Sequence, residues 1–151
     1  MLIFVDCEAD GPCPALGRCT EFAAIAYTEG HQAFFARDIS PEMEHDAFVK
    51  FGEWLDEIDA PRVCVSDNPA FDWQWINDGL WRHYNRNPLG HSARRIGDYY
   101  AGFMGDFRKS QGWKKWRKPK HDHNALHDAQ GNLAAFRHLD SLVSEFHTCE
   151  I

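Results

Sequence analysis

The sequence lacks the cysteine spacing of a zinc site or of a disulfide framework. Its five cysteines stand at positions 7, 13, 19, 64 and 149, an odd number with no Cys-x-x-Cys pair. Disulfide-rich secreted domains carry paired cysteines, and structural zinc sites use closely spaced ones. We therefore expect reduced thiols in a cytoplasmic protein.

Long apolar runs and a basic leader are also missing. No stretch approaches the roughly 20 apolar residues of a membrane helix, and the chain starts directly with an apolar segment at residues 2–5. We expect neither secretion nor a membrane partner.

Positive charge is scarce. The 16 Lys and Arg residues are outnumbered by 23 Asp and Glu, which gives a formal net charge of -7. Broad binding of nucleic acid depends on cationic neutralisation of phosphates, so this balance argues against it, although a small site that recruits cations stays compatible. The basic residues are unevenly spread. One stretch with few opposing acids contains Arg108, Lys109, Lys114, Lys115, Arg117, Lys118 and Lys120.

The chain does have enough apolar material for one domain. Of its 151 residues 44% are hydrophobic and 14% aromatic, so a core can form without metal or disulfide support. No repeats or long linkers divide the sequence. We expect a single domain over residues 1–151.

Local patterns predict three strands followed by alternating helices and strands. The predicted strands are 2–8, 22–27, 32–37, 62–66 and about 94–96, with turns at 10–14 and at Glu29-Gly30; the predicted helices are 41–58, 69–83, about 98–107 and one from residue 125. A strand that follows a crossover helix should lie parallel to the first strand. This order predicts an α/β domain with a mixed five-stranded sheet, in which a three-strand antiparallel meander precedes parallel strands and helices flank the sheet.

Four acids and one histidine are the most informative residues, and the first three acids fall at predicted element boundaries. Asp6 and Glu8 lie at the end of the first strand, where period-2 alternation sends both to one face. Asp72 follows Asn68 and Pro69, a predicted cap and first-position proline that place it on the opening turn of a helix. Paired carboxylates of this kind suit a hard cation.

The histidine and the fourth acid surround the start of the last helix. Asn124 is the predicted cap, which leaves His123 on the preceding loop and Asp128 just inside the helix. A loop imidazole can reposition itself with substrate.

The order Asp-x-Glu, Asn-x-x-Phe-Asp and His-x-x-x-x-Asp resembles the three motifs of the DEDDh (DnaQ-like) 3′-5′ exonucleases of the RNase H-like superfamily, from residue 2 to about residue 135. Each motif alone is weak, but the strand, the capped helix and the helix start that they require are all present. The resemblance implies an RNase H-like fold and two Mg²⁺ or Mn²⁺ ions. It implies four metal ligands, Asp6, Glu8, Asp72 and Asp128, with Asp6 bridging the ions. Glu21 and Asp98 match positions where the family often carries further acids.

The implied chemistry is hydrolysis of the terminal phosphodiester of a single strand, with release of nucleoside 5′-monophosphates. Clustered carboxylates repel one another unless cations neutralise them, and oxygen-only ligands favour Mg²⁺ or Mn²⁺ over zinc. His123 is then the general base, because an imidazole of unperturbed pKa ~6.5 can accept the proton of the attacking water at neutral pH.

Candidate substrate contacts are aromatic or lie next to the acids. Trp113 and Trp116 frame two lysines in residues 109–120, a segment without apolar periodicity that is expected to be a loop. It is either a flap whose tryptophans stack on bases, or a segment whose tryptophans pack on the last helix while its lysines form a solvated rim. Ala9 and Trp73 are candidates by position, and Trp73 is equally consistent with a core aromatic.

Four questions stay open. His121, His123 and His127 with Asp122 could instead form a transition-metal site in a binding or regulatory protein, but this leaves the other acids unexplained. A non-catalytic nucleic-acid-binding relative would usually have lost a ligand. Single-stranded RNA or DNA can be the partner: compact members of the resembled family often trim RNA or short oligonucleotides, so RNA is the expectation. A homodimer is compatible with the same resemblance.

Overall fold

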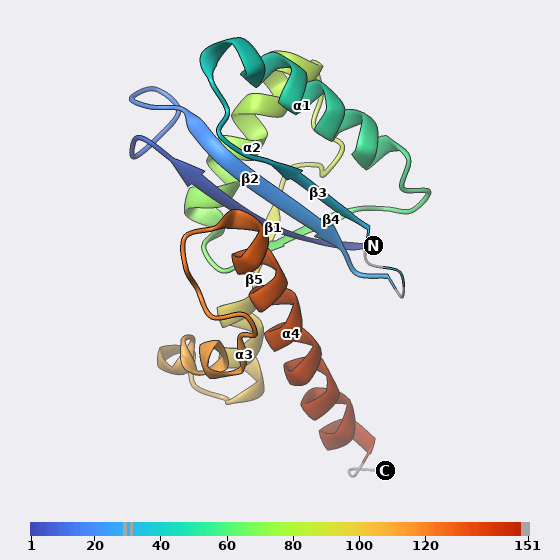
Figure 1. Cartoon of the computed structure of the whole chain (residues 1–151). Coiled ribbons are helices and arrows are strands. Elements are labelled where there is room, and N and C mark those ends of the chain that lie inside the picture. The colour runs from blue at the N-terminus through green and yellow to red at the C-terminus, as the bar shows by residue number, and fades with distance from the viewer. Residues whose placement is uncertain (29, 31, 149–151) are drawn as a thin grey trace.

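The protein is described by a computed structural model that covers residues 1–28, 30 and 32–148. Figure 1 shows the elements in chain order. They are β1 (Leu2–Ala9), β2 (Cys19–Ala26), β3 (Ala33–Ala36), α1 (Pro41–Asp56), β4 (Val63–Ser66), α2 (Pro69–Tyr84), β5 (Ala93–Arg95), α3 (Ile96–Phe103), the 3₁₀ turns η1 (Phe107–Lys109) and η2 (Gly112–Trp116), and α4 (Ala125–Thr148).

The sheet has five strands in the order β3-β2-β1-β4-β5. β1 pairs antiparallel with β2, and β2 pairs antiparallel with β3, which makes the predicted meander. β4 lies parallel to β1 and β5 lies parallel to β4. The predicted fold class, a mixed five-stranded sheet flanked by helices, is therefore confirmed.

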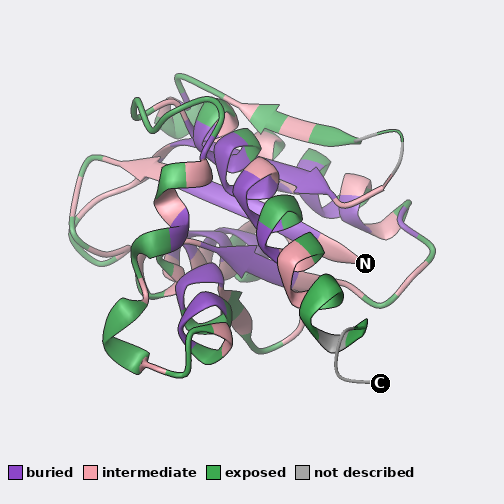
Figure 2. Cartoon of the chain, turned by 90° about the horizontal axis from the view of Figure 1, so that it is seen from below, coloured by how far each residue is buried: buried purple, intermediate pink, exposed green. Residues whose placement is uncertain are grey.

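The two faces of the sheet are covered by different helices. Alternation along β1 divides its apolar side chains, so that Ile3 and Val5 belong to the core on the α1 and α2 face, whereas Phe4 belongs to the core under α3, η2 and α4. Figure 2 shows the resulting band of buried residues through the middle of the molecule. The strand that carries Asp6 and Glu8 is therefore held rigidly from both sides.

The boundaries differ from the predicted ones where tertiary contacts act on the chain. β2 begins at Cys19, three residues before the predicted start, because the loop after β1 closes on itself. Asp10 N–H donates to the Arg18 carbonyl (3.1 Å), and Gly11 and Gly17 pack so closely that a Cβ on either would meet the other's backbone. The α3 helix ends at Phe103, earlier than predicted. Residues 109–120, expected to be a loop, include the last residue of the turn η1 and all of the turn η2.

Both predicted helix caps can be checked. The His127 N–H donates to Asn124 Oδ1 (3.0 Å), which confirms the cap of α4. Asn68 holds the cap position of α2 with Pro69 in the first turn, but its side chain makes no capping hydrogen bond.

The predicted turn at Glu29-Gly30 includes Glu29, which lies outside the described residues. Across the described ranges, no helix has the length and apolar character needed to span a bilayer.

Candidate active site

Three carboxylates converge beside the carboxyl end of the central strand. Asp6 and Glu8 stand on the face of β1 that packs against α4, and Asp128 lies in the first turn of that helix. One carboxylate oxygen from each residue lies within 4.8 Å of the others. Asp6 and Asp128 are buried and Glu8 is half-buried. Strand alternation and the helix start thus produce the arrangement that the motif spacings predicted for these three acids.

The fourth acid, Asp72, lies next to this group and is oriented differently. Its Oδ1 accepts the Cys7 backbone N–H (3.2 Å), and its Oδ2 accepts the Ser66 hydroxyl. The side chain is only 4% exposed. Asp72, which the resemblance gives as a fourth metal ligand, adds charge close to Asp6 but does not join the convergent group, because both of its oxygens accept hydrogen bonds from β1 and β4.

Burial and mutual repulsion raise the pKa values of the clustered acids. Burial, followed by the charges of Asp72, Asp128 and Glu8, raises the pKa of Asp6 to about 9, and the Arg117 guanidinium opposes this rise. Burial also raises the pKa of Asp72 to about 7, against the hydrogen bonds from Ser66 and Cys7. Burial raises the pKa of Glu8, and the His123 imidazole opposes this rise. Such a cluster is fully ionised at neutral pH only if a cation joins it.

The donor set fits a hard divalent cation. All three convergent ligand atoms are carboxylate oxygens, which Mg²⁺ and Mn²⁺ prefer. In the described part of the chain, this group of potential metal ligands contains no histidine. The predicted alternative, a transition-metal site of three histidines, does not fit, because those imidazoles contact three different acids: Asp128, Glu8 and Asp122.

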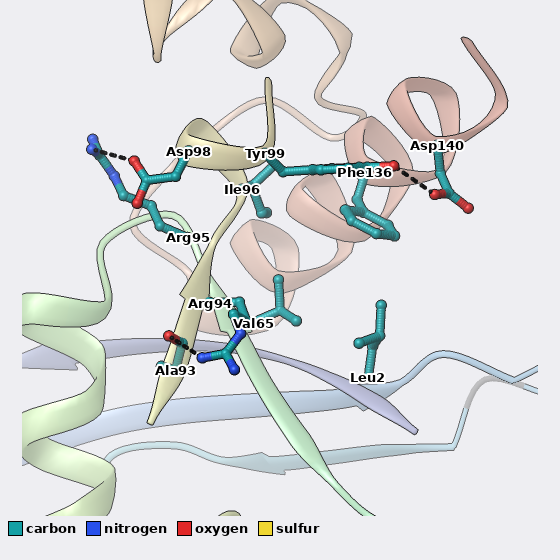
Figure 3. Close-up of a pocket in the computed structure, with 10 residues that line it drawn as sticks. All are labelled: Leu2, Val65, Ala93, Arg94, Arg95, Ile96, Asp98, Tyr99, Phe136 and Asp140. Carbon is teal, nitrogen blue, oxygen red and sulfur yellow. Dashed lines mark hydrogen bonds and ion pairs between the residues drawn. The ribbon is translucent and has the colours of Figure 1, made fainter. Parts of the chain in front are cut away.

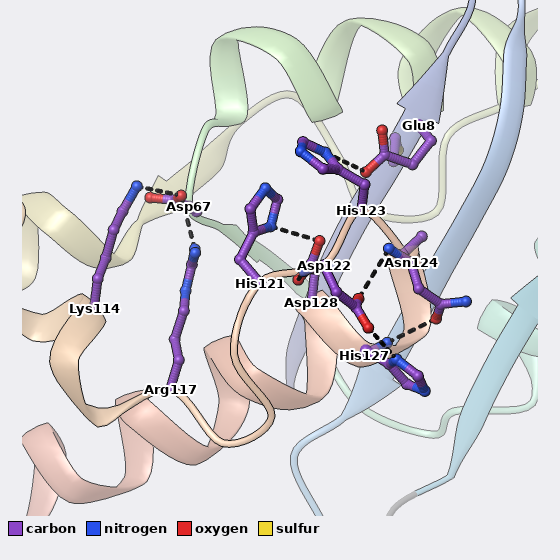
Figure 4. Close-up of polar contacts among 12 residues, drawn as sticks. Glu8, Asp67, Lys114, Arg117, His121, Asp122, His123, Asn124, His127 and Asp128 are labelled. Carbon is purple, nitrogen blue, oxygen red and sulfur yellow. Dashed lines mark hydrogen bonds and ion pairs between the residues drawn. The ribbon is translucent and has the colours of Figure 1, made fainter.

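Two histidines on the loop before α4 reach the acids (Figure 4). His123 Nδ1 lies 3.6 Å from Glu8 Oε1, and its side chain is 76% exposed. His121 Nδ1 lies 2.6 Å from Asp128 Oδ2. The two rings pack edge to face with centroids 4.3 Å apart. His123 also adopts a left-handed backbone (φ 61°), as Asp38 and Asn85 do, a conformation that only a few per cent of non-glycine residues hold.

The histidine loop is fastened to α4 by a polar network. The Asp122 N–H donates to Asp128 Oδ1 (3.2 Å), and Asp122 Oδ2 lies 2.8 Å from His127 Nδ1. Glu21 of β2 accepts the Ala125 N–H (2.6 Å), so it satisfies one of the free donors at the start of α4. Glu21 is thus a structural acid that positions the helix carrying Asp128. This network holds the loop while both imidazoles stay accessible.

A cationic pair stands on the opposite side of the cluster. Asp67, directly after β4, accepts from Arg117 (2.7 Å) and from Lys114 (2.7 Å). The Arg117 guanidinium is 4.8 Å from the centroid of the Trp113 ring and is 9% exposed. This network fixes residues 114–117 beside the acids.

The candidate substrate contacts occupy different environments. Trp113 is fully buried in the core under α4, so no face of its ring is available to a base. Trp116 is half-buried between Tyr100 and His138. Trp73 is half-buried and packs on the opposite core, and Ala9 follows a bulge in the pairing of β1 with β2. The packing interpretation of the 109–120 segment therefore fits Trp113 better than the flap interpretation.

The acid cluster is separate from a cavity of about 470 Å³ between β5, α3 and α4. Figure 3 shows its apolar side chains together with the pairs Arg95–Asp98 and Tyr99–Asp140. Asp98 lines this cavity and is paired with Arg95 (3.5 Å), so it does not join the acid cluster.

Several residues of the site were not found from the sequence. Ser66, Asp67 and Arg117 act through contacts between segments far apart in the chain. The one available signal was the position of Ser66 and Asp67 at the carboxyl end of a parallel strand, where α/β proteins place their sites. His121 was considered only as a ligand of the alternative transition-metal site, because its contact with Asp128 depends on how the loop folds back.

Comparison with known proteins agrees with this geometry. No protein-family profile matches the chain. It is 30% identical to the 3′-5′ DNA exonuclease Cap18 of Escherichia coli, over an alignment of 173 positions that covers 94% of this chain and 92% of the relative. Its fold resembles E. coli exonuclease I bound to single-stranded DNA in the zinc form (TM-score 0.60, 18% identity, 95% of this chain). It also resembles exonuclease I with a dA16 oligonucleotide (TM-score 0.59, 15% identity, 95% of this chain). The chain spans only 40% and 43% of those two proteins, so this likeness shows a shared fold.

Proposed function

The chain belongs to the family of the 3′-5′ DNA exonuclease Cap18, and on that premise we propose that it is a divalent-cation-dependent 3′-5′ exonuclease acting on single-stranded DNA. The observation that carries the proposal is the convergence of Asp6, Glu8 and Asp128, with Asp72 behind them and His123 on the adjoining loop. We assign the enzyme to the DEDDh type on the same residues.

Asp6, Glu8 and Asp128 would hold the cations, and Asp72 would stabilise the site through its charge and its bonds to β1 and β4. When bound, a pair of divalent cations neutralises these carboxylates and stabilises charge on the attacking and leaving oxygens of a phosphodiester. Mg²⁺ is the expected metal, with Mn²⁺ as a substitute.

His123 acts as the general base in this proposal. Its imidazole accepts a proton from a water molecule, and the water oxygen bonds to the terminal phosphorus. The bond between phosphorus and the 3′ oxygen breaks, and the departing 3′ oxygen takes up a proton from solvent. The products are a nucleoside 5′-monophosphate and a strand shortened by one nucleotide. The exposed loop position of His123 lets the imidazole approach the substrate, and Glu8 lies close enough to orient it.

DNA replaces RNA as the proposed substrate. The expectation of RNA rested on family analogy, and the comparisons do not support it, because the matched relative is named as a DNA exonuclease and the structural neighbours hold single-stranded DNA. Recognition of the 2′-hydroxyl needs only a few contacts, which the motifs do not reveal.

The test compares single-stranded DNA, single-stranded RNA and duplex DNA of the same sequence, each with Mg²⁺. We expect the largest kcat/KM on single-stranded DNA, and no hydrolysis of any substrate in chelator. A larger kcat/KM on RNA would overturn the DNA assignment and keep the exonuclease assignment. The Asp6→Asn variant is the control for contaminating nuclease, because it removes a ligand without changing the size of the side chain.

A further inference from the structure

The basic strap, residues 107–120 between α3 and the histidine loop, is anchored to the rest of the molecule. Trp113 inserts fully into the core, and Arg117 is tied to Asp67 (2.7 Å). The Pro119 carbonyl lies so close to Gly131 of α4 that an added Cβ there would be 2.5 Å from it. Figure 1 shows the strap running beside the first part of α4. The strap is thus a fixed surface.

The outward side of the strap is cationic. It contains no acid from Arg108 to Lys120 and carries seven of the 16 Lys and Arg residues of the chain. Five of these are exposed: Arg108, Lys109, Lys115, Lys118 and Lys120. Arg108 is paired with Asp106, and Lys115 lies over Trp116. Lys109, Lys118 and Lys120 have no ion-pair partner among the described residues, so their charges are available to a ligand.

The strap leads directly into the acid cluster. Lys114 and Arg117 bind Asp67 on one side of the site, and one residue beyond the strap His121 contacts Asp128 (2.6 Å). Figure 4 shows these contacts in one view, with Lys114 and Arg117 reaching toward Asp67 and His121 lying between that group and His123. A strand whose 3′ end lies at the acids can therefore extend over the strap.

We propose that the basic strap binds the phosphates of a single-stranded nucleic acid on the 5′ side of the scissile bond, through Lys109, Lys118 and Lys120. This inference rests on the proposed function. The chain carries a net charge of -7, so the surface outside the strap repels a polyanion. The strap is a local concentration of positive charge that attracts it. Because Trp113 faces the core, the strap contacts the backbone by charge, and binding here is independent of base sequence.

The test measures binding of a labelled oligothymidylate by fluorescence anisotropy, in chelator so that no hydrolysis occurs, over a range of salt concentrations. The variant replaces Lys109, Lys118 and Lys120 by Gln. Its matched control replaces Lys50, Arg94 and Arg137 by Gln; these residues are exposed on α1, β5 and α4, and both variants lose the same net charge. Thermal unfolding of both variants confirms that the exposed substitutions leave the fold intact.

We expect the affinity of the strap variant to be lower by on the order of tenfold or more. The slope of log K against log salt should be smaller in magnitude by about 2, since each of the three lost phosphate contacts to a single strand contributes about 0.7. The control variant should keep the wild-type slope. An unchanged slope in the strap variant, an equal loss in the control, or no binding by the wild type would overturn the proposal. If the wild type binds through the strap but never shortens the strand with Mg²⁺, the exonuclease proposal fails and the strap proposal stands.

Discussion

Asp6 determines much of the site's chemistry at the scale of single residues. It is buried between three other acids, and Arg117 provides only partial compensation, so its pKa rises to about 9. Ionisation of a carboxyl in this environment destabilises the metal-free fold, whereas a bound cation favours the ionised form.

The first prediction is that without divalent cations, stability falls as pH rises. Below its ordinary pKa of 3.8, Asp6 is neutral in both states; above it the unfolded chain loses the proton while the folded protein keeps it until about pH 9. The free energy of unfolding should therefore decrease over this window, by on the order of 1 kcal/mol per pH unit for this group. Denaturant unfolding in chelator at several pH values measures it. The Asp6→Asn variant should show a shallower decrease, and the same pH dependence in both proteins would contradict the account.

The second prediction concerns the two imidazoles. His123→Ala should lower kcat by roughly 10²- to 10⁴-fold while cation affinity changes little, because His123 is not one of the three convergent ligands. Steady-state kinetics and Mg²⁺ titration measure the two effects. His91→Ala is the control, since His91 is exposed on the loop before β5. Full activity in His123→Ala, with a large loss in His121→Ala, would move the general base to His121.

At the scale of elements, the segment between α3 and α4 is anchored in a way that its sequence pattern does not reveal. Its tryptophans and basic residues were consistent both with a stacking flap and with packing against the last helix. Trp113 lies in the core, and Arg117 joins the segment to the loop after β4. Apolar periodicity cannot reveal such an anchor, because one tryptophan in a short 3₁₀ turn has no repeat.

The third prediction follows from this anchor. Trp113→Ala should lower the free energy of unfolding by about 3–5 kcal/mol, the usual result of removing a fully buried aromatic side chain. Trp81→Ala is the matched control: Trp81 is 51% exposed, and its loss should cost much less. Chemical denaturation measures both. An unchanged stability in Trp113→Ala, with a raised KM for the strand, would restore the flap interpretation.

At the scale of the whole molecule, the sequence contained most of the fold and part of the site. Period-2 alternation placed Asp6 and Glu8 on one face, and the Asn124 cap placed Asp128 inside α4, because both depend on local geometry. The orientation of Asp72, the Asp67 to Arg117 bond and the His121 contact depend on distant segments meeting. No local pattern encodes those contacts.

The acid cluster and the basic strap lie next to each other in the fold. The acids lie where β1, the loop after β4 and the start of α4 meet, and the basic strap approaches the same place. In the proposed function, an acidic protein binds an anionic strand along one surface while its carboxylates hold cations at the end of that strand. Catalysis and strand binding are thereby assigned to separate residues, which variants can address independently.

The most direct test of the central claim is the digestion of single-stranded DNA labelled at its 5′ end, by the wild type and by the Asp128→Asn variant. We expect a ladder that shortens from the 3′ end with release of nucleoside 5′-monophosphates, only for the wild type and only with Mg²⁺ or Mn²⁺. A product ladder in chelator, an equally active Asp128→Asn variant, or no cation-dependent product from the wild type would contradict it.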